Sequence, residues 1–332
     1  MAKAKTPPWY GAVMGGPSTS PYTTKRVYLN IYCLVWLLLA PTFVFGLMFG
    51  VMSFATRTTG PNGEAQSPWL TWLLALLLGF VCIYLGYYTY NAYVNWKNGE
   101  GSFEQFLILL CLLLSVFGAL IFSVALGQYN YYANSKDLQA LNKLNAYYDV
   151  NACTSSGQQL MDAGRVAFGQ GTSLNLALGG GFRDRTIYCV APIVCANPPA
   201  SIGTAAGPPY DFWAVGTNCC SGLYNDTSFS CKNYNNPSAN GGLRLVNDKQ
   251  RSYYRMAVQQ VEAAYNIRAT HPIFFHWVDD AFEEASEQSA KASKFFAMGM
   301  GGFMMYQLLI VVCLAFYLMK HGFDAGPSEQ QP

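Results

Sequence analysis

The sequence predicts an all-α transmembrane four-helix bundle with a large, disulfide-stapled, mainly helical and loop-rich extracellular or lumenal domain. Three observations support this fold class: long stretches without charge, a low charged fraction, and cysteines gathered in one segment. The chain has 332 residues, of which 52% are hydrophobic and 11% are charged. Soluble domains usually carry roughly 25% charged residues, so the composition favours a membrane protein.

Four stretches without Lys, Arg, Asp or Glu divide the chain, and each is long enough for a membrane span of about 20 residues. They lie between Arg26 and Arg57, Glu64 and Lys97, Glu104 and Lys136, and Lys294 and Lys320. We therefore predict an N-terminal segment at 1–26, three spans within 27–126 (about 27–54, 68–94 and 105–126), a large domain at 127–294, a fourth span at 295–319 and a tail at 320–332.

The positive charges that flank the spans predict the orientation. Lys25 and Arg26 precede the first span, and Lys320 begins the tail. Positive residues near span ends favour the cytoplasmic side. We therefore expect a multi-pass integral protein of the plasma membrane or an endomembrane, with both termini cytoplasmic and the large domain outside or lumenal.

Six of the ten cysteines lie in the large domain, namely Cys153, Cys189, Cys195, Cys219, Cys220 and Cys231. An even number in one segment indicates disulfides and an oxidising compartment, whereas unpaired thiols in a reducing compartment are the alternative. We expect at least two disulfides, with Cys219 and Cys220 bonded to different partners because adjacent residues rarely have the geometry to bond to each other. Asn225 begins an N-glycosylation sequon, which predicts a glycoprotein.

Small and polar residues within the spans predict helix packing. The small residues are Gly46 and Gly50 in span one, Gly79 and Gly86 in span two, and Ala297 and Gly301 in span four. Small residues allow helix backbones to approach closely, although Gly is also simply common in membrane helices. Gln307 and Asn30 are candidates for hydrogen bonds across helices; Asn30 could equally meet water at the headgroup level. Whether these contacts lie within one chain or between chains is open.

The large domain has helical signals at its ends and turn signals in its middle. Leu138, Leu141 and Leu144 recur at helical spacing, as do Tyr254, Val258 and Val261. We expect the two helices to pack against each other as a stalk. Another helical stretch, from about Val278, is expected to run into span four, and 186–194 alternates β-forming residues as a strand does.

No residue pattern indicates catalysis, a cofactor or a metal. His271 and His276 are five residues apart, a spacing that does not place two imidazoles on one helix face, so aromatic packing is the preferred interpretation. The acidic residues between Asp279 and Glu287 could bind a cation or a partner, but a solvated helix face with a Glu287–Lys291 pair is favoured. The net charge of +2 gives no reason to expect a nucleic-acid partner. We expect a protein that is not an enzyme and has no cofactor.

The layout of four spans, two short loops and a large cysteine-bearing third loop resembles the tetraspanin family. The resemblance includes Cys219-Cys220-Ser221-Gly222, although tetraspanins carry adjacent cysteines followed directly by Gly. Asn30 and Gln307 match the polar residues that the family places in spans one and four. The resemblance implies that Cys219 and Cys220 each pair with another cysteine of the loop.

These features lead to an expected function. We expect an organiser or adaptor that binds partner proteins through its spans and its large outer loop; an accessory or structural subunit of a channel, transporter or other multiprotein membrane complex is the alternative. The expected partners are the lipid bilayer, other membrane proteins and a second copy of the chain. The absence of charge from all four spans argues against a proton- or ion-coupled transporter.

Overall fold

The computed structural model describes residues 22–59, 65–66, 69–198, 200, 202, 209–223 and 228–322. Two compact units make up the chain. The helix unit comprises Met1–Arg57, Ser67–Asn130 and Lys294–Pro332, and the sheet unit comprises Thr58–Gln66 and Tyr131–Ser293. Each unit has its own hydrophobic core.

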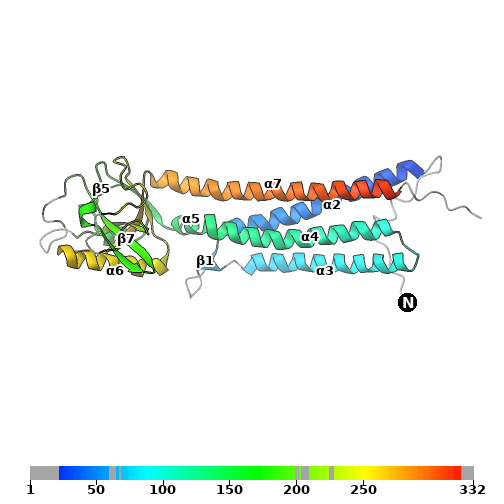
Figure 1. The fold of residues 1–332 in the computed structure, drawn as a ribbon, viewed down its shortest axis with the longest axis horizontal. Coiled ribbons are helices and arrows are strands. Elements are labelled where there is room, and N and C mark those ends of the chain that lie inside the picture. The colour runs from blue at the N-terminus through cyan, green and yellow to red at the C-terminus, as the bar shows by residue number, and fades with distance from the viewer. Residues whose placement is uncertain are drawn as a thin grey trace, which may run out of the picture. The chain divides into compact units, whose positions relative to one another are not determined.

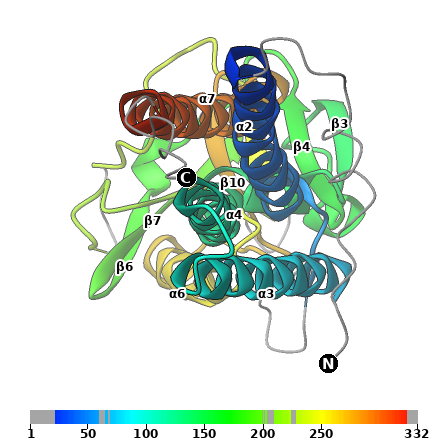
Figure 2. The same cartoon turned by 90° about the vertical axis from the view of Figure 1, so that its right-hand side faces the viewer.

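Four long helices form the helix unit (Figure 1). They are α2 (Tyr22–Phe54), α3 (Trp69–Lys97), α4 (Phe103–Asn130) and α7 (Ala281–Gly322), whose first turns belong to the sheet unit. Each is long and apolar enough to cross a membrane, as predicted. Viewed nearly along their axes, α4 lies between α3 and the pair formed by α2 and α7 (Figure 2).

Two of these helices continue beyond their charge-free stretches. The helical stretch expected before span four begins at Ala281 and is continuous with the span. On the other side, α4 is followed by a π-helix, η1 (Tyr131–Ser135), and by α5 (Lys136–Leu141). The helical spacing of Leu138, Leu141 and Leu144 predicts a helix through Leu144, but the helix ends at Leu141 and strand β3 begins at Asn145.

The sheet unit corrects the predicted fold class. It contains an eight-stranded mixed sheet in the order β3-β4-β9-β10-β8-β7-β5, with β6 paired to β7, so the protein is not an all-α bundle with a mainly helical domain. The strands are β3 (Asn145–Val150), β4 (Ala163–Phe168), β5 (Ser173–Leu174), β6 (Gly180–Asp184), β7 (Thr186–Val194), β8 (Phe212–Thr217), β9 (Gly241–Arg244) and β10 (Ile273–Val278). The strand expected at 186–194 is β7.

The sheet contains both parallel and antiparallel strand pairs. The pairs β3–β4 and β8–β10 are parallel, and the other pairs are antiparallel. Parallel neighbours require a crossover connection, and α6 (Asp248–Tyr265) lies in the segment between β8 and β10. A separate two-stranded hairpin is formed by β1 (Thr58–Thr59) and β2 (Ala65–Gln66).

Both faces of the sheet are buried. On one face, Val190 and Trp213 pack with Tyr254, Val258 and Val261 of α6, and all five side chains are at most 1% exposed. The other face buries a second cluster, which includes Phe168, Cys189, Phe212, Phe275 and Trp277.

The packing of α6 also corrects the stalk prediction. The apolar stripe of α6 covers the sheet, whereas Leu141 packs in a separate cluster with Leu243, Val278 and Ala281. The α6 stripe is buried, and Leu141 is buried while Leu138 and Leu144 are partly buried, but the two stripes do not pack against each other. The apolar surface that covers the α6 stripe is the sheet, not the opposite helix.

A buried carboxylate connects three segments of the sheet unit. Asp211, immediately before β8, is 1% exposed. Its Oδ2 accepts a hydrogen bond from the Gly157 amide at 2.8 Å, and its Oδ1 accepts one from the His271 amide at 2.9 Å. The Asp211 carbonyl also accepts from the Ile273 amide at 2.7 Å. The same residue therefore aligns β8, the start of β10 and the 3₁₀ helix η2 (Gly157–Leu160).

Candidate functional site

All six cysteines of the large domain are paired. The disulfides are Cys153–Cys195, Cys189–Cys220 and Cys219–Cys231. The expectation of disulfide bonds is therefore confirmed, and the adjacent cysteines have different partners. The sulfurs of Cys189, Cys219 and Cys231 lie within 4.8 Å of one another, but a disulfide sulfur is not a thiolate ligand, so this cluster has no free ligand for a metal.

Gly46 and Gly50 of α2 face α7. A Cβ on Gly46 would lie 3.0 Å from Met300 Cε, and one on Gly50 would lie 3.7 Å from a ring atom of Phe296. Phe45, the residue before Gly46, stacks on Phe303 of α7 with ring centroids 4.2 Å apart. The two glycines thus make room for large side chains of the facing helix.

The small residue of α7 that meets α2 differs from the predicted pair. Gly299 lies against the ring of Phe49. Ala297 is exposed, and a Cβ on Gly301 would meet no atom within 4 Å. The rotation of α7 about its axis therefore turns Ala297 and Gly301 outward from the bundle.

Gln307 is the polar centre of the bundle. Its side chain is fully buried, and its Nε2 donates to the Leu37 carbonyl of α2 at 2.7 Å and to the Ser115 hydroxyl of α4 at 3.3 Å. One side chain of α7 thus bonds to two other helices. The side chain of Asn30 and the whole of Asn225 lie outside the described residues, so both stay predictions.

The remaining polar motifs have structural roles. His276 lies in β10 between the core residues Phe275 and Trp277, and burial lowers its pKa. Asp280 Oδ1 accepts from the Phe282 amide at the start of α7, which caps that helix. Glu287 pairs with Lys291 at 3.6 Å, as expected.

The outward face of α3 is the least covered apolar surface among the four spans. In the most apolar 18-residue stretch of α3, 11% of the residues are buried within the protein, against 33% in the corresponding stretch of α2. The buried residues of α3 are Thr71, Cys82 and Thr89. The Thr89 hydroxyl donates to the Leu85 carbonyl at 2.8 Å and lies 3.5 Å from the Leu109 carbonyl of α4, so this edge packs on α4.

Two glycines lie along one edge of that outward face. A Cβ on Gly79 or on Gly86 would meet no atom within 4 Å. Gly79, Ile83, Gly86 and Tyr90 are spaced by four, three and four residues, which places them along one line of the helix surface. Ile83 is 69% exposed and Tyr90 is 64% exposed. We call these four residues the α3 seam, a line of alternating small and large side chains.

Tyrosine hydroxyls lie beside the α3 seam at an unusual depth. Ile83 is the midpoint of α3, so the rise of about 1.5 Å per residue puts Tyr84 and Tyr87 about 1.5 and 6 Å from the centre of the span. Both depths are well inside the roughly 15 Å half-thickness of the hydrocarbon layer. Tyr84 and Tyr87 are exposed, and the Tyr84 hydroxyl donates to the Tyr88 hydroxyl at 2.9 Å. Lipid tails offer no hydrogen-bond partner to such hydroxyls.

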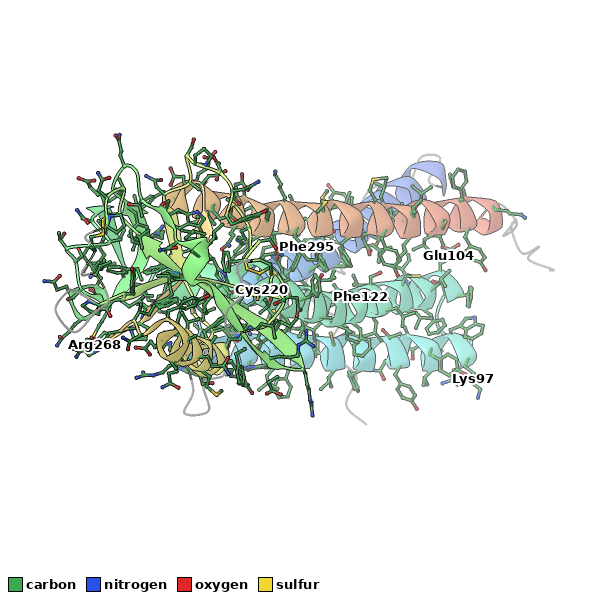
Figure 3. The ribbon with its side chains drawn as sticks, turned by 60° about the vertical axis from the view of Figure 1, so that its left-hand side comes forward. Lys97, Glu104, Phe122, Cys220, Arg268 and Phe295 are labelled. Carbon is green, nitrogen blue, oxygen red and sulfur yellow. A yellow bond between two sulfur atoms is a disulfide. The ribbon has the colours of Figure 1, made fainter. Side chains whose placement is uncertain are left out.

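A shallow apolar hollow lies elsewhere on the helix unit. Phe45, Phe122, Leu126, Gly299, Gly302, Phe303 and Tyr306 line it. Phe122 is labelled on α4 in Figure 3. Apart from Tyr306 this lining is apolar, so it can accommodate an acyl chain or an apolar side chain.

The α3 seam was only partly visible in the sequence. The pair Gly79 and Gly86, one heptad apart, was recognised as a packing candidate, but the partner could not be assigned. The sequence analysis makes no prediction about the neighbouring Tyr84, Tyr87 and Tyr88. Their distance from the centre of α3 is the signal that could have identified Tyr84 and Tyr87 as buried in the hydrocarbon layer.

Comparison of the chain with protein-family models, with curated proteins and with solved structures finds no match. Arguments about function therefore rest on the four spans, the disulfide-bonded sheet unit and the exposed α3 seam.

Proposed function

We propose that this protein is a membrane organiser or adaptor that binds other membrane proteins laterally through its spans and through its large outer domain. The observation that carries the proposal is the α3 seam with the tyrosines beside it. Small residues exposed to lipid allow a second helix to approach closely, and hydroxyl groups in the hydrocarbon layer are satisfied by a polar group on that helix.

The sheet unit supports the same role from outside the membrane. Its sheet is covered on both faces, and three disulfides restrain its loops. Such a rigid scaffold presents loops with little entropy to lose on binding. We propose that both termini are cytoplasmic and that the sheet unit is extracellular or lumenal, since disulfides persist in oxidising compartments.

We also propose a tetraspanin-like arrangement. Four membrane-crossing helices, the different partners of Cys219 and Cys220, and the interhelical bonds of Gln307 support it. Ser221 between the cysteine pair and glycine, and the mixed sheet in the large domain, separate this chain from the pattern that the resemblance implied.

The proposed function is tested by blocking the α3 seam. A photo-crosslinking residue at Ile83 of the full chain should capture a membrane protein in cells that express it. Gly79→Leu with Gly86→Leu should abolish the adduct, because the added side chains fill the seam. The thermal stability of the protein should not change, since no atom lies within 4 Å of either added Cβ.

Gly301→Leu is the matched control, because Gly301 has the same open surroundings on α7. That variant should keep the adduct. Adducts that persist in the Gly79→Leu/Gly86→Leu variant would contradict the proposal. A single partner in fixed stoichiometry would instead favour the accessory-subunit function, whereas several partners in variable amounts would favour the organiser.

A further inference from the structure

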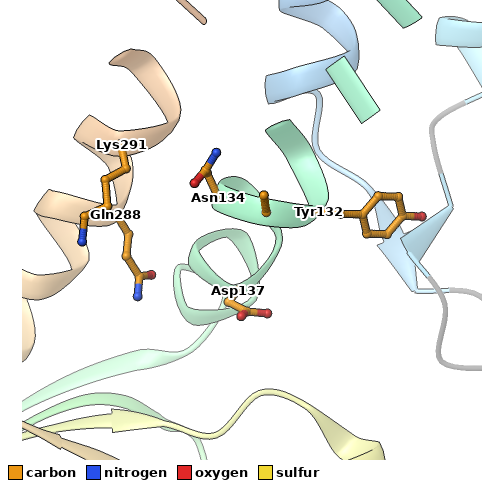
Figure 4. A pocket seen from close by; sticks show the side chains of 6 residues that line it. Tyr132, Asn134, Asp137, Gln288 and Lys291 are labelled. Carbon is orange, nitrogen blue, oxygen red and sulfur yellow. The ribbon is translucent and has the colours of Figure 1, made fainter. Parts of the chain in front are cut away.

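A polar pocket in the sheet unit lies beside the π-helix η1 (Figure 4). Tyr132, Ala133 and Asn134 of η1, Asp137 of α5, and Gln288 and Lys291 of α7 line it. Its volume is about 230 Å³, many times the roughly 10–15 Å³ that a single water requires. The pocket can therefore hold a group of several heavy atoms.

The π-helix gives a reason to expect a function here. Single π-helical turns are rare and frequently occur at functional sites. The Ser135 hydroxyl, next to Asn134, is buried and has no hydrogen-bond partner among the described residues. Native structures seldom leave such a group unsatisfied. A π-helical turn therefore forms one wall of the pocket, and an unsatisfied hydroxyl lies in its last residue.

The pocket lies at the depth of lipid headgroups. Along α7, Lys291 precedes Phe295, where the charge-free stretch begins, by four residues, or about 6 Å of helix. The headgroup layer on each side of the hydrocarbon is roughly 5–7 Å thick. Gln288 is one turn further out. On the other wall, Tyr131 and Tyr132 begin η1, and tyrosines are typical of the headgroup level.

The charges in the pocket are of both signs. Lys291 and Gln288 project from α7 on one side, and Asn134 and Asp137 lie on the opposite wall (Figure 4). The Lys291 ammonium group pairs with Glu287 at 3.6 Å, but both side chains are 58% exposed, and exposed pairs of this kind contribute little. Lys291 is therefore available to an anionic oxygen, and Asp137 to a cation.

The aromatic ring next to the pocket does not form a cage for a cation. Tyr132 points away from Lys291 and Gln288 (Figure 4), and its ring lies 6.0 Å below the Lys136 ammonium group. Quaternary ammonium groups are recognised by aromatic faces. A carboxylate with neighbouring amides, as found here, instead suits an ammonium group with N–H donors.

We propose that this pocket binds a phosphodiester that carries a primary ammonium group, as in a phosphatidylethanolamine headgroup. Lys291 binds the phosphate, Asp137 accepts from the ammonium group, and Asn134 and Gln288 hydrogen-bond to the remaining oxygens and N–H groups. The site is independent of the α3 seam and of any partner protein that the seam binds.

The test uses the full chain in phosphatidylcholine nanodiscs that contain a phosphatidylethanolamine probe with a photoreactive group near its phosphate. We expect labelled peptides from 131–141 and 281–294. Unlabelled phosphatidylethanolamine should suppress this labelling, whereas added phosphatidylglycerol should not. Lys291→Gln and Asp137→Asn should each weaken probe binding about tenfold, which corresponds to about 1.4 kcal/mol.

Lys294→Gln is the matched control, because Lys294 is an exposed lysine one turn further along α7 that does not line the pocket; its labelling should equal that of the wild type. If free glycerophosphoethanolamine suppresses the labelling at the same concentration as the lipid does, the pocket recognises the proposed headgroup chemistry, and its ligand is a soluble molecule. Equal labelling in Lys291→Gln and wild type, or equal competition by phosphatidylglycerol, would overturn the proposal.

Discussion

Replacing Asp211 by Ala removes the acceptor that aligns three segments of the sheet unit. Two amides, those of Gly157 and His271, lose their hydrogen bonds to a carboxylate that is 1% exposed. A hydrogen bond to a charged group contributes about 1.5–3 kcal/mol, so the variant should lose about 3–6 kcal/mol. That is a large part of the roughly 5–15 kcal/mol by which a domain is stable.

Hydrogen exchange measured by mass spectrometry on the detergent-solubilised full chain resolves this effect locally. Protection of peptides from β8 and β10 should fall about 10²–10⁴-fold in Asp211→Ala, since each tenfold change corresponds to about 1.4 kcal/mol. Peptides of α2 and α4 should not change, because these helices belong to the other unit.

Asp184→Ala is the control, since Asp184 is exposed at the end of β6. Its exchange should stay within about threefold of the wild type. If Asp211→Ala kept the protection of β8 and β10 at that same level, the carboxylate would not hold these strands together and our reasoning would be refuted.

Three further predictions follow from buried groups. Gln307→Leu should destabilise the helix unit by only about 0.6–1.7 kcal/mol in detergent unfolding, the range measured for interhelical hydrogen bonds. The double variant Cys189→Ala/Cys220→Ala removes a disulfide between residues 31 positions apart. The loop-entropy relation predicts that the sheet unit loses about 3–4 kcal/mol of unfolding free energy, which thermal unfolding measures. Burial lowers the pKa of His276 below its ordinary value of 6.5, so the unfolded state binds a proton more readily, and stability should fall as the pH drops from 7.5 through 6.5.

Each of these predictions has an outcome that contradicts it. If Gln307→Leu lowered the unfolding free energy by more than about 3 kcal/mol, far beyond the range of about 0.6–1.7 kcal/mol, the Gln307 side chain would stabilise the helix unit by more than these two hydrogen bonds. Unchanged unfolding of the double cysteine variant under oxidising conditions would show that the cross-link restrains little. If His276→Gln kept the full pH dependence of the wild type between pH 7.5 and 5.5, this imidazole would not be its source.

Within the sheet unit, sequence reasoning found β7 and α6 but missed the sheet as a whole. The last seven of the nine residues in β7 are buried, and so are five of the six in β8. Strands buried on both faces lose the alternation of polar and apolar residues by which strands are recognised. The strand β9 has only four residues, Gly241–Arg244, and begins with two glycines. A pair of glycines is a turn signal, so the sequence predicts a loop there.

The sequence alone determined which segments can cross a membrane and that the large domain is disulfide-bonded. Both are local properties: a span must be apolar over its whole length, because lipid cannot satisfy charge, and cysteine usage follows the redox compartment. Only the tertiary structure decided that α6 covers a sheet, that Gly299 rather than Gly301 meets α2, and that Gly79 and Gly86 are left open. These outcomes depend on how each helix is rotated and on which distant segments pair. Because the hydrophobic effect is non-directional, neither can be predicted from composition or residue spacing.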